Sequence, residues 1–223
     1  MHRRYFIRKI ILFSLSLVIL KTKIMANSLF KPFNLVNGIF VNNYVSHKSS
    51  FKDFWRWRRE SSRPEPIAFP VVENDPEYLK SNKSEKTITW IGHSTFLLQI
   101  NGINILTDPH FTKRASPLSF MGPSRTTPPG LKIEELPFID FVLISHNHYD
   151  HLDSKTIQLL LKKQNVNQPT FFVPLKLKDI ISKLGANNVV EHEWWQMTQF
   201  KNLEIYSVPV QHWSKRTFND TNK

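Results

Sequence analysis

The chain has 223 residues, enough for one sizeable domain or two small ones, and it has no cysteine, which excludes disulfide frameworks and thiolate metal sites. Its formal net charge is +12, but nine of its 30 Lys and Arg residues fall within residues 1–52, where no acidic residue occurs. The rest of the chain carries 21 basic and 18 acidic residues, a balance of only +3. This distribution argues against a nucleic-acid-binding domain.

Residues 1–26 form a basic and apolar segment, in which four basic residues precede the apolar run Ile10–Leu20. The run is too short to span a membrane, because eleven helical residues reach only about half of a ~30 Å hydrocarbon core. Three interpretations stay open. The segment is a signal that exports the protein, an uncleaved membrane-associated segment, or an upstream extension of a cytoplasmic protein that starts at Met25.

Residues 27–86 are predicted to be an irregular lead-in, because they are polar and interrupted by prolines. Within them, Phe51–Arg59 mixes aromatic and cationic residues. This mixture is typical of a membrane interface, and it is equally compatible with tryptophans that pack on the domain.

Residues 87–223 are predicted to form the folded domain. Thr87–Ile91, Phe96–Ile100 and Ile103–Leu106 are apolar-rich runs, and Asn101-Gly102 is a hairpin turn signal, so an antiparallel meander is expected. The following loop, Pro109–Pro137, is long enough to indicate a functional or disordered segment.

The second part of the domain alternates between strand and helix patterns, which predicts parallel strands and an α/β fold. The expected elements are a strand at Phe138–Ile144, a helix at Ser154–Lys163, a strand at Thr170–Val173, a helix at Leu175–Leu184, and strands at Asn188–Glu191 and Leu203–Val208.

The most informative stretch is Ser145–Asp153, which reads S-H-N-H-Y-D-H-L-D directly after a predicted strand. His146 and His148 are two residues apart and project to the same side, so they can share one metal. Asp150 and His151 follow a turn and can face a second one. Imidazole and carboxylate ligands suit zinc or another first-row divalent ion. The competing interpretation, surface or N-capping histidines, is less favoured because so dense a ligand cluster is an electrostatic liability without a cation.

Three further residues stand at predicted strand ends. His212 is a candidate metal ligand. Asp108, in Thr107-Asp108-Pro109, either hydrogen-bonds a metal ligand or simply forms the turn before proline. His93, in the sequence G-H-S-T, is either structural or a similar supporting residue.

Five motifs together resemble the metallo-β-lactamase superfamily, and within it the branch of N-acyl-phosphatidylethanolamine-hydrolysing phospholipase D. They are W-I-G-H-S-T (90–95), L-T-D-P (106–109), E-E-L-P-F-I-D-F-V-L-I-S-H-N-H-Y-D-H-L-D (134–153), E-W-W (193–195) and P-V-Q-H-W (209–213). The resemblance implies an αββα sandwich with two zinc ions bridged by hydroxide.

The resemblance also implies roles for individual residues. His146, His148 and His212 would hold one zinc, and Asp150 and His151 the other, which makes the latter pair the candidate catalytic residues. The metal-bound hydroxide would attack a phospholipid substrate, releasing phosphatidic acid from an N-acylethanolamine. A lactonase or another metal-dependent hydrolase of the same fold is the alternative.

The sequence departs from the family in one respect. An Asp that bridges the metals and a last His lie in the family's C-terminal half, whereas this chain ends at Lys223, with only Asp220 as a remaining candidate. We therefore expect mainly the N-terminal half of the sandwich, an exposed apolar face, poor solubility, at most one tightly bound metal and no turnover by these residues alone. An inactive, truncated remnant is the third interpretation.

Overall fold

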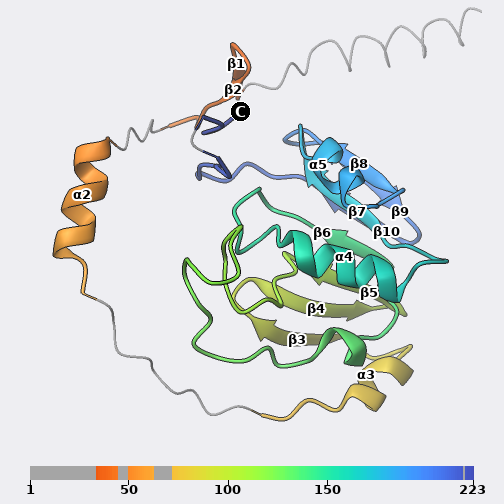
Figure 1. Ribbon diagram of the computed structural model, residues 1–223. Helices are drawn as coiled ribbons and strands as arrows, with labels where there is room; N and C mark the ends of the chain where they lie inside the picture. Colours follow the sequence, from red (N-terminus) through yellow and green to blue (C-terminus); the bar gives the residue numbers. More distant parts are fainter. Residues whose placement is uncertain (1–33, 45–49, 63–71, 218) are drawn as a thin grey trace, which may run out of the picture.

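The computed structural model describes residues 34–44, 50–62, 72–217 and 219–223 (Figure 1). Its centre is a six-stranded mixed sheet with the strand order β3-β4-β5-β6-β7-β8. The strands are β3 (Thr87–Gly92), β4 (Thr95–Ile100), β5 (Ile103–Thr107), β6 (Phe141–Leu143), β7 (Thr170–Pro174) and β8 (Val189–His192). The predicted α/β fold class is confirmed.

The meander β3-β4-β5 is antiparallel, as predicted. Asn101 and Gly102 both have positive φ, 53° and 73°, which is the backbone that a tight two-residue hairpin turn requires. From β5 to β8 each strand pairs in parallel with the next, which confirms the pattern of alternating strands and helices for this part of the domain. All carboxyl ends of β5, β6, β7 and β8 therefore lie at one edge of the sheet.

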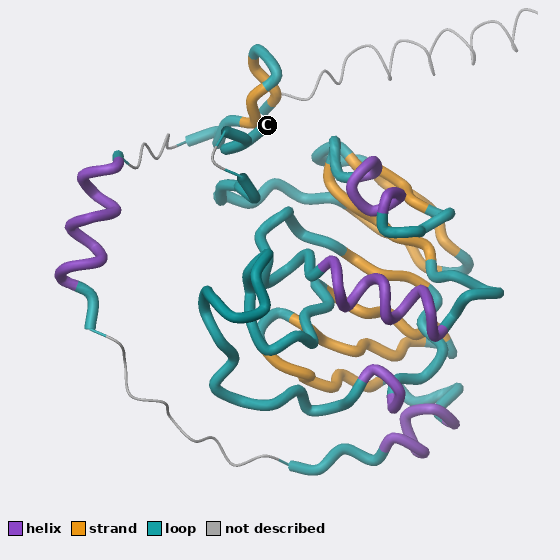
Figure 2. The backbone as a smooth tube through the Cα atoms, viewed as in Figure 1, coloured by secondary structure: helices purple, strands orange, loops and turns teal. Residues whose placement is uncertain are grey.

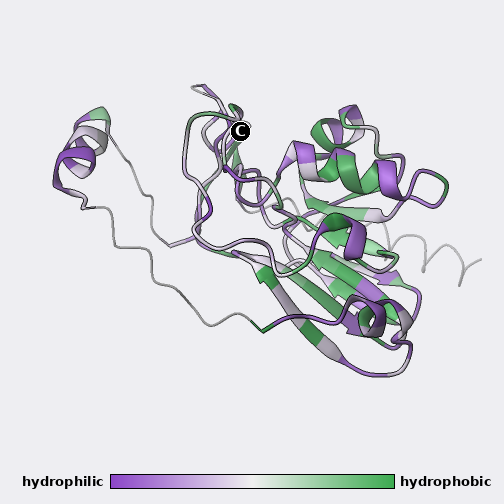
Figure 3. Cartoon of the chain, turned by 60° about the horizontal axis from the view of Figure 1, so that its bottom comes forward, coloured by the Kyte–Doolittle hydropathy of each residue, from purple (hydrophilic) through white to green (hydrophobic). Residues whose placement is uncertain are grey.

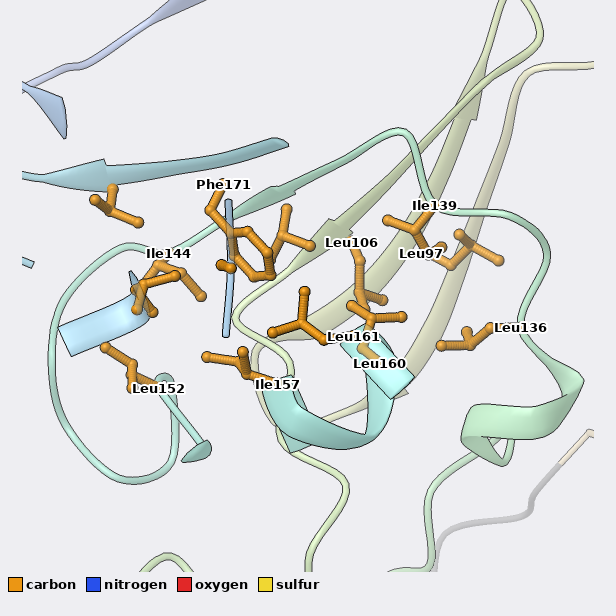
Figure 4. Packing of buried hydrophobic residues seen from close by; sticks show 14 of the residues in the cluster. Leu97, Leu106, Leu136, Ile139, Ile144, Leu152, Ile157, Leu160, Leu161 and Phe171 are labelled. Carbon is orange, nitrogen blue, oxygen red and sulfur yellow. The ribbon is translucent and has the colours of Figure 1, made fainter. Parts of the chain in front are cut away.

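Helices lie on one side of the sheet. They are α3 (Pro76–Ser81), the 3₁₀ helix η1 (Ile133–Glu135), α4 (Ser154–Lys163) and α5 (Lys178–Lys183). Two of them, α4 and α5, stand in front of the strands in Figures 1 and 2. Asp153 caps α4 by accepting hydrogen bonds from Lys155 N and Thr156 N. The apolar side of α4 then packs on the sheet to form the larger core (Figure 4).

The opposite face is covered in part by a hairpin of β9 (Met197–Phe200) and β10 (Leu203–Tyr206). Phe200 packs edge-on against Phe141 and Phe172, with ring centroids 5.0 and 5.7 Å away. Apolar residues run along the sheet strands in Figure 3. At β3 they meet solvent, because Ile88 is 76% and Trp90 49% exposed. The expected exposed apolar residues are therefore present on this face.

The prediction of an irregular lead-in over residues 27–86 is wrong for part of its length. Besides α3, this segment contains β1 (Leu35–Val36), β2 (Ile39–Phe40) and α2 (Phe51–Glu60). A capping box starts α2, because the Ser50 and Asp53 side chains each bind the other's backbone N–H. The prolines fall outside these elements or, in α3, at a permitted first-turn position.

The basic and apolar segment of residues 1–26 lies outside the described residues. Among the residues that are described, no helix is both long and apolar enough to cross a bilayer.

The contact of α4 with the sheet gives a stability prediction. Leu160 is 1% exposed, so Leu160→Ala should lower the free energy of unfolding by about 2–5 kcal/mol through lost burial and a residual cavity. Gln158→Ala, at an exposed position of the same helix, should change it by less than about 0.5 kcal/mol. Chemical denaturation of the metal-free protein measures both. Equal effects of the two substitutions would contradict this packing.

Candidate metal centre

The site begins where β5 and β6 end side by side. Asp108 N donates a hydrogen bond to Leu143 O at 2.8 Å, which continues the strand pairing by one step. The Asp108 backbone then turns with φ of 36°, and its carboxylate accepts hydrogen bonds from Ser145 N and Ser145 Oγ, both at 2.7 Å. We call Ser145–Asp153 the histidine loop. Its first residue, Ser145, is thus fixed to the neighbouring strand end.

His146, His148 and His212 form the first group of potential ligands. One nitrogen of each lies within 4.8 Å of the others. His146 Nε2 faces His148 Nδ1 at 2.8 Å, and Ser145 Oγ lies 2.9 Å from His146 Nδ1. A single ion can be shared by three such nitrogens, which is a common zinc donor set. The structure therefore brings together the three histidines that the resemblance assigns to one metal.

His93, Asp150 and His151 form the second group, again with ligand atoms within 4.8 Å of one another. His93 Nε2 lies 2.8 Å and His151 Nε2 3.6 Å from Asp150 Oδ2. Sequence analysis placed His93 in a structural or supporting role. In the structure it stands inside the group, because the turn between β3 and β4 ends beside the histidine loop.

Asp108 occupies the supporting position that its strand-end location suggested. Its Oδ2 lies 2.9 Å from His151 Nδ1, on the far side of the ring from Asp150. A carboxylate at this nitrogen holds the proton there and leaves Nε2 as the ligand atom. Asp108 therefore connects the strand pairing to the orientation of His151.

Two histidines of the first group favour the neutral form that metals bind. Burial, followed by the charges of the three neighbouring imidazoles, lowers the pKa of His146 to about 3. Burial and then His212 lower the pKa of His148. In addition, His148 Nε2 is buried and has no hydrogen-bond partner in the described part of the chain. Two neutral imidazoles, one of them with an unpartnered nitrogen, fit a metal ion better than they fit a network of hydrogen bonds.

The second group combines a carboxylate with imidazoles. Burial alone would raise the pKa of Asp150, but His151 and then His93 lower it overall. Burial alone would lower the pKa of His151, and the hydrogen bond and charge of Asp108 raise it overall. Asp150 is thus an anion at neutral pH. A carboxylate beside imidazoles is a mixed donor set that suits zinc.

Arg216 ties the segment that carries His212 to the histidine loop. Its Nη1 donates hydrogen bonds to Asn147 O and Leu152 O, both at 2.8 Å, and its guanidinium carbon stacks 4.1 Å from the Tyr149 ring centroid. Tyr149 Oη in turn donates to Arg216 O at 2.9 Å. Arg216 was not predicted as part of the site, because no local sequence pattern indicates that an arginine will bond carbonyls more than 60 residues away.

The comparisons with known proteins agree with this geometry. A family model described as a beta-lactamase superfamily domain matches residues 103–223. An N-acyl-phosphatidylethanolamine-hydrolyzing phospholipase D of Caenorhabditis elegans is 40% identical over 144 residues, 60% of this chain and 40% of that protein. An uncharacterized protein of Mycobacterium tuberculosis is 38% identical over 161 residues, 71% of this chain and 42% of that protein. The chain thus spans about two fifths of the length of these curated relatives.

A solved structure also matches, the diiron beta-hydroxylase CmlA from Streptomyces venezuelae. It is 24% identical, with a TM-score of 0.44, and the match covers 57% of this chain and 24% of that one.

The position of Asp108 gives a prediction about metal binding. Asp108→Asn should weaken the second zinc by about 10- to 100-fold, because His151 loses the carboxylate that orients it, while the first zinc stays bound. Asp179→Asn, an exposed position on α5, is the matched control. Zinc titration of the metal-free protein under native mass spectrometry measures both steps. An unchanged second step in Asp108→Asn would exclude this role for Asp108.

Proposed function

Because the chain belongs to the beta-lactamase superfamily, we propose that it carries the zinc-binding part of a hydrolase that acts on the phosphodiester of N-acyl-phosphatidylethanolamine-like lipids. The products would be phosphatidic acid and an N-acylethanolamine. The main support is the pair of adjacent ligand groups, one of three histidines and one of His93, Asp150 and His151. The 40% identity to the C. elegans phospholipase D supports the lipid phosphodiester as the substrate class.

An apolar groove beside the first ligand group supports a lipid substrate. It is lined by His146 and His212, by apolar side chains from several segments, and by polar residues that include Asn34, Asn42, Asn147 and Glu193. The apolar lining residues include Phe40, Val41, Leu175, Trp194, Val210 and Trp213. Binding sites for lipid-like molecules are concave and mostly apolar with a few polar groups at the reacting end. An acyl chain in this groove would direct the headgroup toward the histidines.

The chemistry divides between the ions and the protein. Bound zinc ions would lower the pKa of a water molecule toward neutrality and offset the charge that builds on the phosphoryl oxygens. The residues of this chain hold those ions in place: His146, His148 and His212 at one position, with His93, Asp150 and His151 at the other. Asp108 and Ser145 keep the loop and its imidazoles oriented.

Two alternatives use the same fold and are separable by experiment. Similar histidine clusters support many hydrolytic reactions, so a lactonase remains the competing enzyme. An inactive remnant is the competing non-enzyme. The test is an assay of the zinc-loaded protein on N-acyl-phosphatidylethanolamine vesicles with lactones in parallel. Release of N-acylethanolamine supports the proposal, and opening of the lactones alone supports the first alternative. Because no turnover is expected of residues 1–223 by themselves, the second alternative is supported when a chain extended by the family's C-terminal half converts neither substrate.

Association with membranes is part of the same proposal. The helix α2 presents Trp57, 63% exposed, among several arginines, a composition that suits a lipid interface. Three locations stay predictions: at a membrane, exported through the N-terminal segment, or in the cytoplasm if the protein starts at Met25. We also predict that residues 1–223 alone do not turn over the substrate, and the assay tests this when it is run on those residues.

Asp150 gives the sharpest test of the mechanism. In protein that hydrolyses the lipid, Asp150→Asn should lower the rate by about a hundredfold or more, because the second ion loses its only carboxylate among the assigned ligands, while the first zinc remains bound. Asp179→Asn should leave the rate unchanged. Product release from vesicles and zinc content are measured together. Turnover near the wild-type rate in Asp150→Asn would remove this residue from the mechanism.

A further inference from the structure

A second pocket opens next to the His93 group, away from the apolar groove. Its lining includes Trp90, Gly92, His93, His110, Arg125 and Asp150. Arg125 and His110 belong to the long segment between β5 and β6, to which no role has yet been given. The pocket therefore joins the second ligand group to a basic side chain that the metal centre does not use.

Arg125 is held in this pocket by backbone carbonyls. Its Nη1 donates a hydrogen bond to His110 O, and its Nε donates one to Thr127 O at 3.3 Å. Within the described parts of the chain, Nη2 makes no hydrogen bond and Arg125 takes part in no ion pair. The side chain is about half buried, so its positive charge is partly removed from water without a carboxylate in contact.

Gly92 makes room for the guanidinium. A Cβ added at this position would lie 2.2 Å from Arg125 Nη2, so the guanidinium would have to move away from its present place. Gly92 also has φ of 140°, a backbone that side-chain-bearing residues rarely adopt. The end of β3 is thus shaped so that Nη2 can lie against the backbone at the wall of the pocket.

His110 adds a second polar group with an unused atom. It is 4% exposed, it lines the same pocket, and its Nε2 has no hydrogen-bond partner among the described residues. Its Nδ1 lies 3.4 Å from Arg125 Nη1, so the ring and the guanidinium are neighbours. A buried polar atom without a partner is costly unless a ligand or water binds it.

We propose that this pocket binds an anionic phosphoryl oxygen of the substrate, with Arg125 as the charged donor and His110 beside it. The inference rests on the proposed function and assigns the substrate's charged group to the His93 side of the centre. A guanidinium without a carboxylate partner favours an anion, and its planar set of donors matches phosphoryl oxygens. The Asp150 carboxylate in the same pocket is engaged by His93 Nε2 at 2.8 Å. The lipid then lies across both ligand groups, with its apolar chain in the groove.

The test is calorimetric titration of inorganic phosphate into the zinc-loaded full chain. Arg125→Gln should weaken phosphate binding by about tenfold or more, because a charged donor is lost. Arg114→Gln is the matched control. Arg114 lies in the same segment and bonds Gly122 O at 2.6 Å, and it does not line the pocket. Zinc content and the unfolding midpoint are recorded for each variant.

Equal phosphate affinity in Arg125→Gln and the wild type would overturn the inference, since the anion would then sit on the metal ions alone. No phosphate binding by the wild type would overturn it too. Should Arg125→Gln fail to fold, the NMR signal of the Arg125 Nε–H in the wild type replaces it. A saturable shift on phosphate addition supports the inference, and no shift overturns it. Lipid hydrolysis is measured separately. If the protein binds phosphate through Arg125 and does not hydrolyse the lipid, the proposed function is refuted and the phosphate site is not.

Discussion

The Asp108 carboxylate links the strand pairing to the ligand groups. It accepts hydrogen bonds from Ser145 N and Ser145 Oγ at the start of the histidine loop, and it holds His151 Nδ1 at the end of that loop. A buried carboxylate is stable only when such partners are present, so the parallel pairing of β5 with β6 and the shape of the loop depend on each other. The same carboxylate orients His151 of the second ligand group relative to the sheet.

The remaining ligands come from segments that only the complete fold brings to this edge. His93 arrives from the turn between β3 and β4, and His212 from the chain after β10. Arg216 fastens the latter through carbonyls of the histidine loop. Metal binding should therefore be coupled to folding, because separate segments supply the ligands. The apolar groove is lined by residues of the first ligand group, and the Arg125 pocket by residues of the second.

Features with a local signal could be predicted from the sequence. The candidate ligands His146, His148, Asp150 and His151 follow from their spacing, and the Asn101-Gly102 hairpin follows from turn chemistry. The helix α2 was missed because the prolines of its surroundings outweighed the capping residues. The strand β9 was missed because its residues, M-T-Q-F, form no apolar run and gain their strand form by pairing with β10.

Roles that depend on distant contacts could not be predicted in this way. His93 and Asp108 each had two open interpretations, since a histidine or aspartate in a turn has the same local pattern whether or not a metal group lies nearby. Arg125 and Arg216 donate hydrogen bonds to backbone carbonyls. Every residue has a backbone carbonyl, so the sequence does not show which of them an arginine will reach. His212 was a candidate from its strand-end position, and the family resemblance grouped it with His146 and His148. The structure supplies its distance from His146, with ring centroids 4.5 Å apart.

We expect these residues to form a metal centre with one tight position and a weaker second one. The measurement is a zinc titration of the metal-free chain, with the wild type and His148→Gln side by side. The wild type should bind one zinc tightly and a second zinc more weakly, and His148→Gln should lose the tight step. Absence of any stoichiometric zinc in the wild type, or a tight step that survives His148→Gln, would show that no such centre forms.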